Sequence, residues 1–246
     1  MENGSTLRRI PAVQAKLPRP FRGGARFTVA VDVALFTIRD QALKVLLVKR
    51  AAAPFRNAWA LPGGFVRRNE SVDEAALREL QEETGISRVY LEQLYTFGDL
   101  DRDPRGRVIS VSYYAVVDSE QLEAQARMNT SGTRLFPVTR LPELAFDHRK
   151  IVGYALERLR NKVNYTSVAF QLLPRTFTLS ELQRAYEVIL GQKLDKRNFR
   201  KKMLQLGILK DTGEQQVEGR QRPARLYAFT EAKVIKLQEK GIIVPF

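Results

Sequence analysis

Residues 64–86 read GFVRRNESVDEAALRELQEETGI, and this stretch decides the fold. From Ser71 to Thr84 it contains no Gly or Pro, carries apolar residues at helical spacing, and meets Gly85 where a helix would end. Ser71 and Glu74 have the residue types and the separation of a capping box, a motif that opens helices. The pattern therefore predicts one helix over this segment.

Three glutamates share one face of the predicted helix. Glu79, Glu82 and Glu83 stand at positions i, i+3 and i+4. Crowded carboxylates repel one another, and beside a tight glycine turn a hard divalent cation such as Mg²⁺ explains them. Such a cation would clamp a pyrophosphate and activate water. The alternative is an ordinary amphipathic helix with a solvated acidic face.

The spacing of this segment resembles a complete Nudix box. Its defining positions are filled by Gly64, Glu70, Arg78, Glu79, Leu80, Glu82, Glu83, Gly85 and Ile86. The resemblance implies an α/β/α Nudix sandwich in which Glu79, Glu82 and Glu83 bind the metal, Mg²⁺ or Mn²⁺, with the Gly63 carbonyl as a further ligand. It also implies that Arg78 belongs to the catalytic set and, with Glu70, holds loop and helix together.

Substrates of such proteins are nucleoside diphosphates linked to another moiety, which water cleaves by attack at phosphorus. The catalytic base is either Glu79 or an acid in the charged loop GDLDRDPRGR, residues 98–107. Candidate ligand-binding residues are Arg50, Arg56, Gly64 and Arg102. The three arginines could pair with phosphates, and the alternative is that they are ordinary surface arginines.

Three further side chains are less strongly indicated as ligand-binding residues. Phe55 and Trp59 could stack a base, although core packing is the expected role of Trp59. His148 is the only histidine and precedes a predicted helix, so we expect it to cap or pack, with Asp147 as an alternative N-cap.

The segments around the box predict an α/β domain. The β-branched runs 27–38 and 42–50 flank Arg39 to Gln41 and read as a β-hairpin. Further strands are expected at 59–61, 90–97 and 108–117, and a helix at 149–162 closes the domain.

After Tyr165 the pattern changes. A helix is expected from 176 to 190, opened by a capping box of Thr178 and Glu181 and ended by Gly191. A second helix spans about 195–206, and apolar segments at 208–209 and 226–229 read as a hairpin. This order predicts a winged helix-turn-helix.

The second of these helices is strongly basic. Phe199, Met203 and Leu206 form its buried stripe, which would turn the cations outward. The candidate DNA-binding residues are Lys196, Arg197, Asn198, Arg200 and Lys201 on the helix, with Arg220 and Arg222 on the wing. The alternative is an interaction module with a solvated basic face.

Charge and composition agree with this division. The net charge of +14 divides into +5 for residues 1–26, +2 for 27–165 and +7 for 166–246. We accordingly expect a flexible basic arm, a Nudix domain and a winged helix over these three ranges. Without cysteine or a membrane-length apolar stretch, the expected location is the bacterial cytoplasm, on the nucleoid when bound to DNA, and no membrane partner is expected.

From Phe27 to Phe229 the chain resembles the Nudix-related transcriptional regulators of NAD metabolism. The resemblance rests on KVLLV (44–48), WALPGGF (59–65), DPRGR (103–107), AFDH (145–148), FTLSEL (177–182) and RPARLY (222–227). It implies a homodimer on a palindromic operator in double-stranded DNA, with the Nudix domain sensing ADP-ribose or a related nucleotide.

Two functions remain open at this point. One is an ADP-ribose-responsive repressor, with or without ADP-ribose hydrolysis to AMP and ribose 5-phosphate. The other is a plain Mg²⁺-dependent Nudix pyrophosphatase whose C-terminal unit serves dimerisation. The basic tail domain favours the first, and the intact box favours the second.

Overall fold

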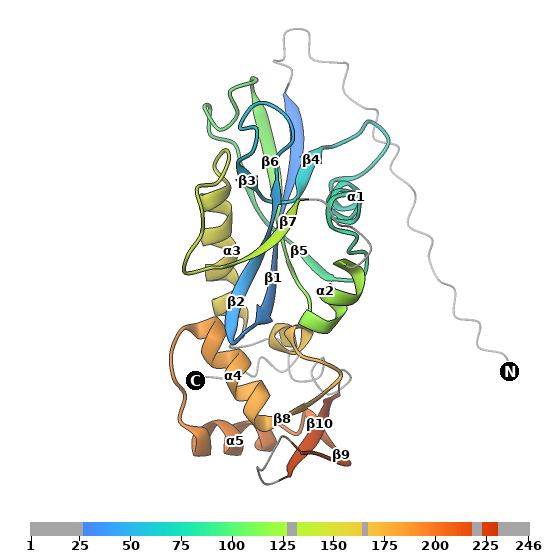
Figure 1. The fold of residues 1–246 in the computed structure, drawn as a ribbon, viewed down its shortest axis with the longest axis vertical. Helices are drawn as coiled ribbons and strands as arrows, with labels where there is room; N and C mark the ends of the chain where they lie inside the picture. The colour runs from blue at the N-terminus through green and yellow to red at the C-terminus, as the bar shows by residue number, and fades with distance from the viewer. Residues whose placement is uncertain (1–26, 127–131, 164–166, 218–222, 231–246) are drawn as a thin grey trace, which may run out of the picture.

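The computed structural model describes residues 27–126, 132–163, 167–217 and 223–230 (Figure 1). The expected basic arm over 1–26 lies outside these ranges, as do the wing residues Arg220 and Arg222. No helix of the described part is long and apolar enough to span a bilayer.

The predicted β-hairpin is confirmed. Strands β1 (Thr28–Arg39) and β2 (Ala42–Lys49) pair antiparallel, joined by Asp40 and Gln41 at φ 51° and 58°. Positive φ at both turn residues matches the right-handed twist of the strands that they connect. The turn therefore brings β2 back alongside β1 without splaying the pair.

These two strands belong to a seven-stranded mixed sheet with the path β3-β2-β1-β6-β5. Strand β1 runs parallel to β6, while β4 pairs with β1 and β7 with β2. The remaining strands are β3 (Trp59–Ala60), β4 (Gly63–Phe65), β5 (Tyr90–Phe97), β6 (Val108–Val116) and β7 (Thr133–Pro137). Strands β4 and β7 were not predicted from the sequence, because they are short and lack a distinctive apolar alternation.

Helices cover both faces of this sheet. Helices α1 (Val72–Thr84) and α2 (Ser119–Ala126) lie on one side and α3 (His148–Val163) on the other (Figure 1). Alternate residues of β1 enter two cores: Val33 packs in the cluster with α1, and Ala34 in the cluster with α3. The α/β/α sandwich is therefore present, and it includes α2, which the sequence analysis did not predict.

The C-terminal part is a winged helix. It contains the 3₁₀ helix η1 (Ser167–Leu172), α4 (Leu179–Leu190) and α5 (Lys196–Gln205), with a sheet of order β8-β10-β9. Its strands are β8 (Thr176–Thr178), β9 (Leu209–Gln216) and β10 (Ala224–Phe229). The expected helix start at Thr176 is wrong, because residues 176–178 pair with β10 as a strand before Thr178 caps α4.

The two parts share one apolar core. The cluster on the α3 face of the large sheet includes Phe36 and Leu159, and it continues through Phe170 of η1 to Phe177 and Met203 of the winged helix. Interiors packed in this way transmit displacement, because few voids are available to absorb it. The winged helix is thus attached to the sandwich by packed side chains as well as by the chain.

Candidate functional sites

Two arginines contact the acidic helix α1: Arg67 donates to Glu82 at 3.2 Å, and Arg78 makes most of the contacts. Arg78 donates from Nε and Nη2 to both carboxylate oxygens of Glu70, at 2.8 and 2.6 Å, and from Nη1 to Glu79 at 2.6 Å and Glu82 at 3.2 Å. The hydrogen bond from Arg78, followed by the Arg67 backbone N–H, lowers the pKa of Glu70 to about 2. Arg78 therefore joins the loop before α1 to the acidic face of the helix.

Glu83, the third glutamate of the predicted metal set, contacts the glycine turn and not Arg78. Glu83 accepts a hydrogen bond from the Gly63 N–H at 3.0 Å. Burial, and repulsion from the Glu79 carboxylate, raise the pKa of Glu83 to about 7, although the Gly63 hydrogen bond opposes this. Across the described ranges, no group of three acidic, histidine or cysteine side chains converges in a metal-binding arrangement.

The donor chemistry nevertheless fits a hard divalent cation. Glu79, Glu82 and Glu83 offer carboxylate oxygens on one helix face, the ligand type that Mg²⁺ prefers. A nearby cation would also remove the electrostatic cost of ionising the half-buried Glu83. It would have to compete with Arg78 for the other two carboxylates.

The glycine turn facing α1 admits no side chain. A Cβ on Gly64 would lie 2.3 Å from Oε1 of Glu79, and one on Gly63 would lie 2.2 Å from the Val31 carbonyl oxygen. Gly63 is therefore required by close approach to the β1 backbone, whereas a side chain at Gly64 would displace the Glu79 carboxylate. This packing sets the backbone of the turn directly against the acidic helix.

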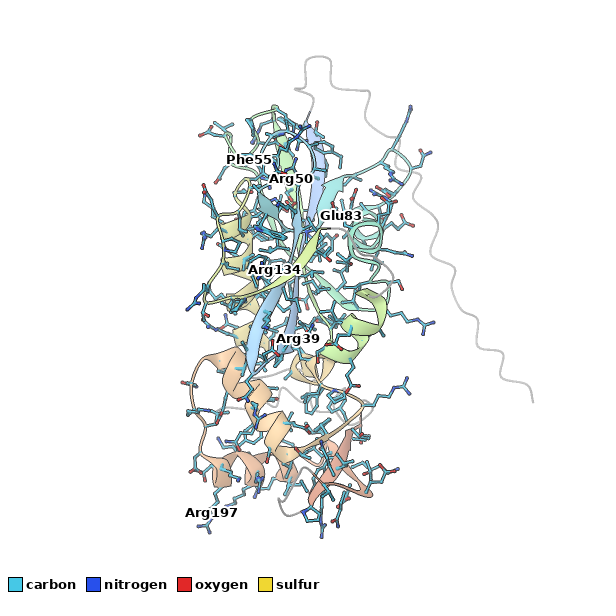
Figure 2. All side chains as sticks on the ribbon, viewed as in Figure 1. Arg39, Arg50, Phe55, Glu83, Arg134 and Arg197 are labelled. Carbon is cyan, nitrogen blue, oxygen red and sulfur yellow. The ribbon has the colours of Figure 1, made fainter. Side chains whose placement is uncertain are left out.

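A cavity of about 160 Å³ lies beside this turn. Three of the predicted ligand-binding residues line it, namely Arg50, Gly64 and Arg102, whereas Arg56 is exposed in the 51–58 loop and is not among the lining residues. Figure 2 shows Arg50 and Glu83 in the same half of the molecule, toward the end opposite the winged helix. Arginines beside a carboxylate helix and a glycine turn form a pocket suited to phosphates.

The floor of this cavity is a buried polar network. Arg102 pairs with Asp32 at 3.2 Å and with Asp147 at 2.8 Å, so it is a buried ion-pair residue rather than a surface arginine. His148 Nδ1 accepts from the Leu61 N–H at 2.8 Å, and its Nε2 lies 3.2 Å from Asp32. The side chain of Asp147 is thus engaged by Arg102, and His148 joins two walls of the cavity.

Asp32 is a functional candidate that the sequence analysis missed. Burial would raise the pKa of Asp32, but His148, the Ser110 hydroxyl and Arg102 outweigh that effect and lower it to about 2. The available signal was a single acid within an otherwise apolar strand run. A buried carboxylate needs partners, and here they come from three other segments of the chain.

Two aromatic rings, those of Phe65 and Phe146, also line the cavity. The Arg50 guanidinium lies 4.8 Å from the centroid of Phe146, and that of Arg105 lies 4.8 Å from Phe65. Phe55 is 44% exposed and packs edge-on against Phe146 at 4.8 Å. Trp59 instead packs on Phe136 against the core, as expected. Phe65, Phe146 and Arg105 were not predicted, because only the fold brings them together.

Helix α5 presents the second candidate site. It carries five cations and no acid in its ten residues, and Asp195 caps it by accepting from the Asn198 N–H at 2.8 Å. Phe199 and Met203 are buried, as predicted. The exposed candidates are Lys196, Arg197, Asn198 and Lys201. Figure 2 shows Arg197 extending from the outer end of the molecule, away from the cavity.

Arg200 departs from the expectation that it projects outward. It is half-buried, donates from Nη2 to the Ser180 hydroxyl of α4 at 3.0 Å, and its Nε is buried with no hydrogen-bond partner. Residue 200 lies one position beyond the buried Phe199, which turns its stem toward α4. Arg200 therefore braces the two helices against each other, and its contact with DNA stays a prediction.

These two sites, on this fold, define a protein with an N-terminal Nudix domain and a C-terminal DNA-binding winged helix. Family models match accordingly: the NUDIX domain over residues 26–155 and the NrtR DNA-binding winged helix domain over residues 169–229.

Known proteins share both parts in the same order. The chain is 39% identical over 205 residues to the ADPR responsive transcriptional repressor NtrR of Acinetobacter baylyi, covering 82% of this chain and 81% of that protein. It superposes on Shewanella oneidensis NrtR, crystallised with a 27mer DNA, with a TM-score of 0.76 and 39% identity, covering 84% of this chain and 95% of that one. The chain belongs to the NrtR family.

The N-terminal part alone is similar to an enzyme. The ADP-ribose pyrophosphatase of Methanocaldococcus jannaschii is 42% identical over 120 residues, which are 49% of this chain and 70% of that protein.

Proposed function

We propose that this protein is an ADP-ribose-responsive transcriptional repressor of NAD metabolism genes, acting as a homodimer on a palindromic operator in double-stranded DNA. One observation carries the proposal: a Nudix cavity and an exposed cationic helix stand at opposite ends of one continuous core. The A. baylyi relative is named an ADPR responsive repressor, and the S. oneidensis relative was crystallised with DNA. A ligand with unequal affinity for the free and DNA-bound protein shifts that equilibrium.

The cavity supports a nucleoside diphosphate ligand. Arg50 supplies a guanidinium beside the glycine turn, and Gly64 lets the backbone approach closely. Phe146 and Phe65 offer aromatic surface for a base or a ribose. Arg102, already paired with Asp32 and Asp147, would hold the cavity lining in place for the ligand.

We further propose that Glu79, Glu82, Glu83 and the Gly63 carbonyl hold Mg²⁺ or Mn²⁺. When bound, the cation neutralises pyrophosphate charge and activates water. Arg78 would then keep Glu70 against the helix while it yields Glu79 and Glu82.

The test is a DNA-binding titration of the full chain at fixed salt, because phosphate contacts make affinity strongly salt-dependent. A labelled duplex from upstream of its own gene is titrated with and without ADP-ribose, and AMP serves as the control nucleotide. We expect specific binding that ADP-ribose weakens and AMP does not. An affinity that ADP-ribose leaves unchanged would contradict the proposal.

A second function is supported by the completeness of the box. Every carboxylate of the box is present, and the pKa of Glu83 is raised to about 7. The Nudix domain could therefore also hydrolyse ADP-ribose to AMP and ribose 5-phosphate. Hydrolysis would make the signal self-limiting. To test hydrolysis, ADP-ribose is incubated with the protein and either Mg²⁺ or a chelator, and AMP formation is monitored by chromatography. The absence of AMP with both Mg²⁺ and Mn²⁺ would exclude hydrolysis.

A further inference from the structure

The C-terminal end of α4 is capped by a residue from the other domain. Helix α4 has no basic residue in its own last turn and ends at Gly191, at φ 71°. Arg160 of α3 donates from Nε to the Ile189 carbonyl oxygen at 3.0 Å, and its Nη2 lies 3.5 Å from where a Cβ on Gly191 would stand. A cation at this end satisfies an orphan carbonyl and complements the helix dipole.

The position of α4 fixes the position of α5. The Glu187 carboxylate of α4 accepts from the Leu194 N–H at 3.0 Å, and the Gln183 side chain donates to the Leu194 carbonyl oxygen at 3.0 Å. Tyr186 and Phe199 pack edge-to-face at 5.4 Å between the two helices. The cationic helix therefore follows any displacement of the end of α4.

The other end of α3 forms part of the Nudix cavity. Its first residue, His148, accepts from the Leu61 N–H and faces Asp32, while Asp147 just before it pairs with Arg102. Lys150 in the first turn pairs with Asp99 at 2.8 Å. The start of α3 is thus bonded to the β3–β4 turn, to β1 and to the 98–107 loop.

Between its two ends, α3 is firmly packed. Ile151, Ala155, Leu159 and Val163 are fully buried in the core that the two domains share. With 16 residues, the helix spans about 24 Å at its rise of 1.5 Å per residue. Such a helix moves as a unit, since close packing leaves little room for bending.

We propose that Arg160 is the positioning residue through which occupancy of the Nudix cavity alters DNA affinity. A ligand in the cavity contacts the side chains that hold the first turn of α3. Binding that favours one arrangement of this turn also favours one position of Arg160, and hence of α4 and α5. The inference rests on the proposed ADP-ribose response and assigns its route through the molecule.

The test compares Arg160→Met with Arg158→Met in the full chain. Arg158 is the matched control, because it also lies on α3 and donates to a backbone carbonyl, that of Leu94 in β5, within the Nudix domain. For each protein, DNA affinity is measured with and without ADP-ribose, and ADP-ribose affinity is measured by calorimetry.

We expect wild type and Arg158→Met to share one ratio of DNA dissociation constants with and without ligand, of about fivefold or more. In Arg160→Met the ratio should fall close to one while ADP-ribose affinity is kept, and Arg160→Lys should restore part of it. A full ratio in Arg160→Met would overturn the inference and leave the proposed function standing. A ratio of one in wild type would overturn both.

A measurement on wild type keeps the inference testable if Arg160→Met does not fold. Amide hydrogen exchange is followed with and without ADP-ribose in the segment from Ile189 to Leu194. We expect the ligand to change exchange there by a few-fold, because the Arg160 contact is altered. No change in this segment, beside clear protection around the cavity, would contradict the proposed route.

Discussion

Helices α1 and α5 are both strongly charged, but they differ in how far their charged side chains contact the rest of the protein. On the acidic face of α1, Glu79 and Glu83 are half-buried and are engaged by Arg78 and the glycine turn. The basic face of α5 extends into solvent, with Arg197 at the outer end of the molecule (Figure 2). A site that must hold a small ligand is preorganised by its own protein, whereas a site for a polyanion can leave its cations solvated until the partner arrives.

The largest expected effect breaks the acidic site alone. Glu83→Gln should weaken Mg²⁺ or Mn²⁺ affinity by at least about 100-fold, because a ligand is lost and not merely a supporting contact. Any hydrolysis should fall in step, while DNA affinity without ligand stays unchanged. Calorimetry with Mn²⁺ checks this, with the exposed Glu157→Gln of α3 as control; wild-type metal affinity in Glu83→Gln would refute the metal assignment.

The next prediction compares the loss of stability when one arginine is removed from each of the two helices. Arg78→Met leaves Glu70 and Glu79 without their partner, at side-chain exposures of 12% and 14%. We expect a clear loss of unfolding free energy, because both carboxylates lose their charge-assisted hydrogen bonds. Arg197→Met should change it by less than about 0.5 kcal/mol, because the side chain is exposed. Urea denaturation compares them, and equal losses would contradict the contrast.

A smaller effect probes the basic helix. Arg197→Ala should weaken operator binding about tenfold and lower its dependence on salt. ADP-ribose affinity should be unaffected, since the residue stands at the far end of the molecule from the cavity. Lys210→Ala, exposed on β9, is the charge-matched control. Unchanged DNA affinity in Arg197→Ala would remove α5 from the interface.

The last effect concerns pH. In metal-free protein, burial and Glu79 raise the pKa of Glu83 to about 7, above its ordinary 4.5. Between these values the folded protein holds more protons than the unfolded chain, so this group's contribution to stability falls as pH rises through the window. Glu83→Gln should remove that dependence, a difference of about 5 °C in Tm between pH 5 and pH 8. Equal pH profiles would contradict the shifted pKa.

The sequence predicted some elements closely because their signals are local. Both capping boxes, Ser71 with Glu74 and Thr178 with Glu181, are present, as are the left-handed ends at Gly85 and Gly191. Each depends on residues within one turn of one another. Short elements without such signals, such as β4, β7 and β8, were missed because tertiary pairing alone makes them strands.

The candidate sites divide along the same line. The carboxylates of α1 and the cations of α5 could be assigned from helical spacing, since one helix carries each set. The partners of Arg102 could not, because Asp32 lies 70 residues away in sequence and Asp147 lies 45. Nor could the half-buried position of Arg200, which depends on where Ser180 of α4 stands.

By itself, then, the sequence determined the order of the domains, the metal-type acid pattern and the cationic helix. Capping hydrogen bonds and helical periodicity depend on residues close together in the sequence. These features can therefore be predicted from short segments. Only the tertiary structure decided the Asp32, Arg102 and His148 network and the contact of Arg160 with Ile189. Those pairs form when packed layers bring distant segments together, and the burial that they share is a property of the whole fold.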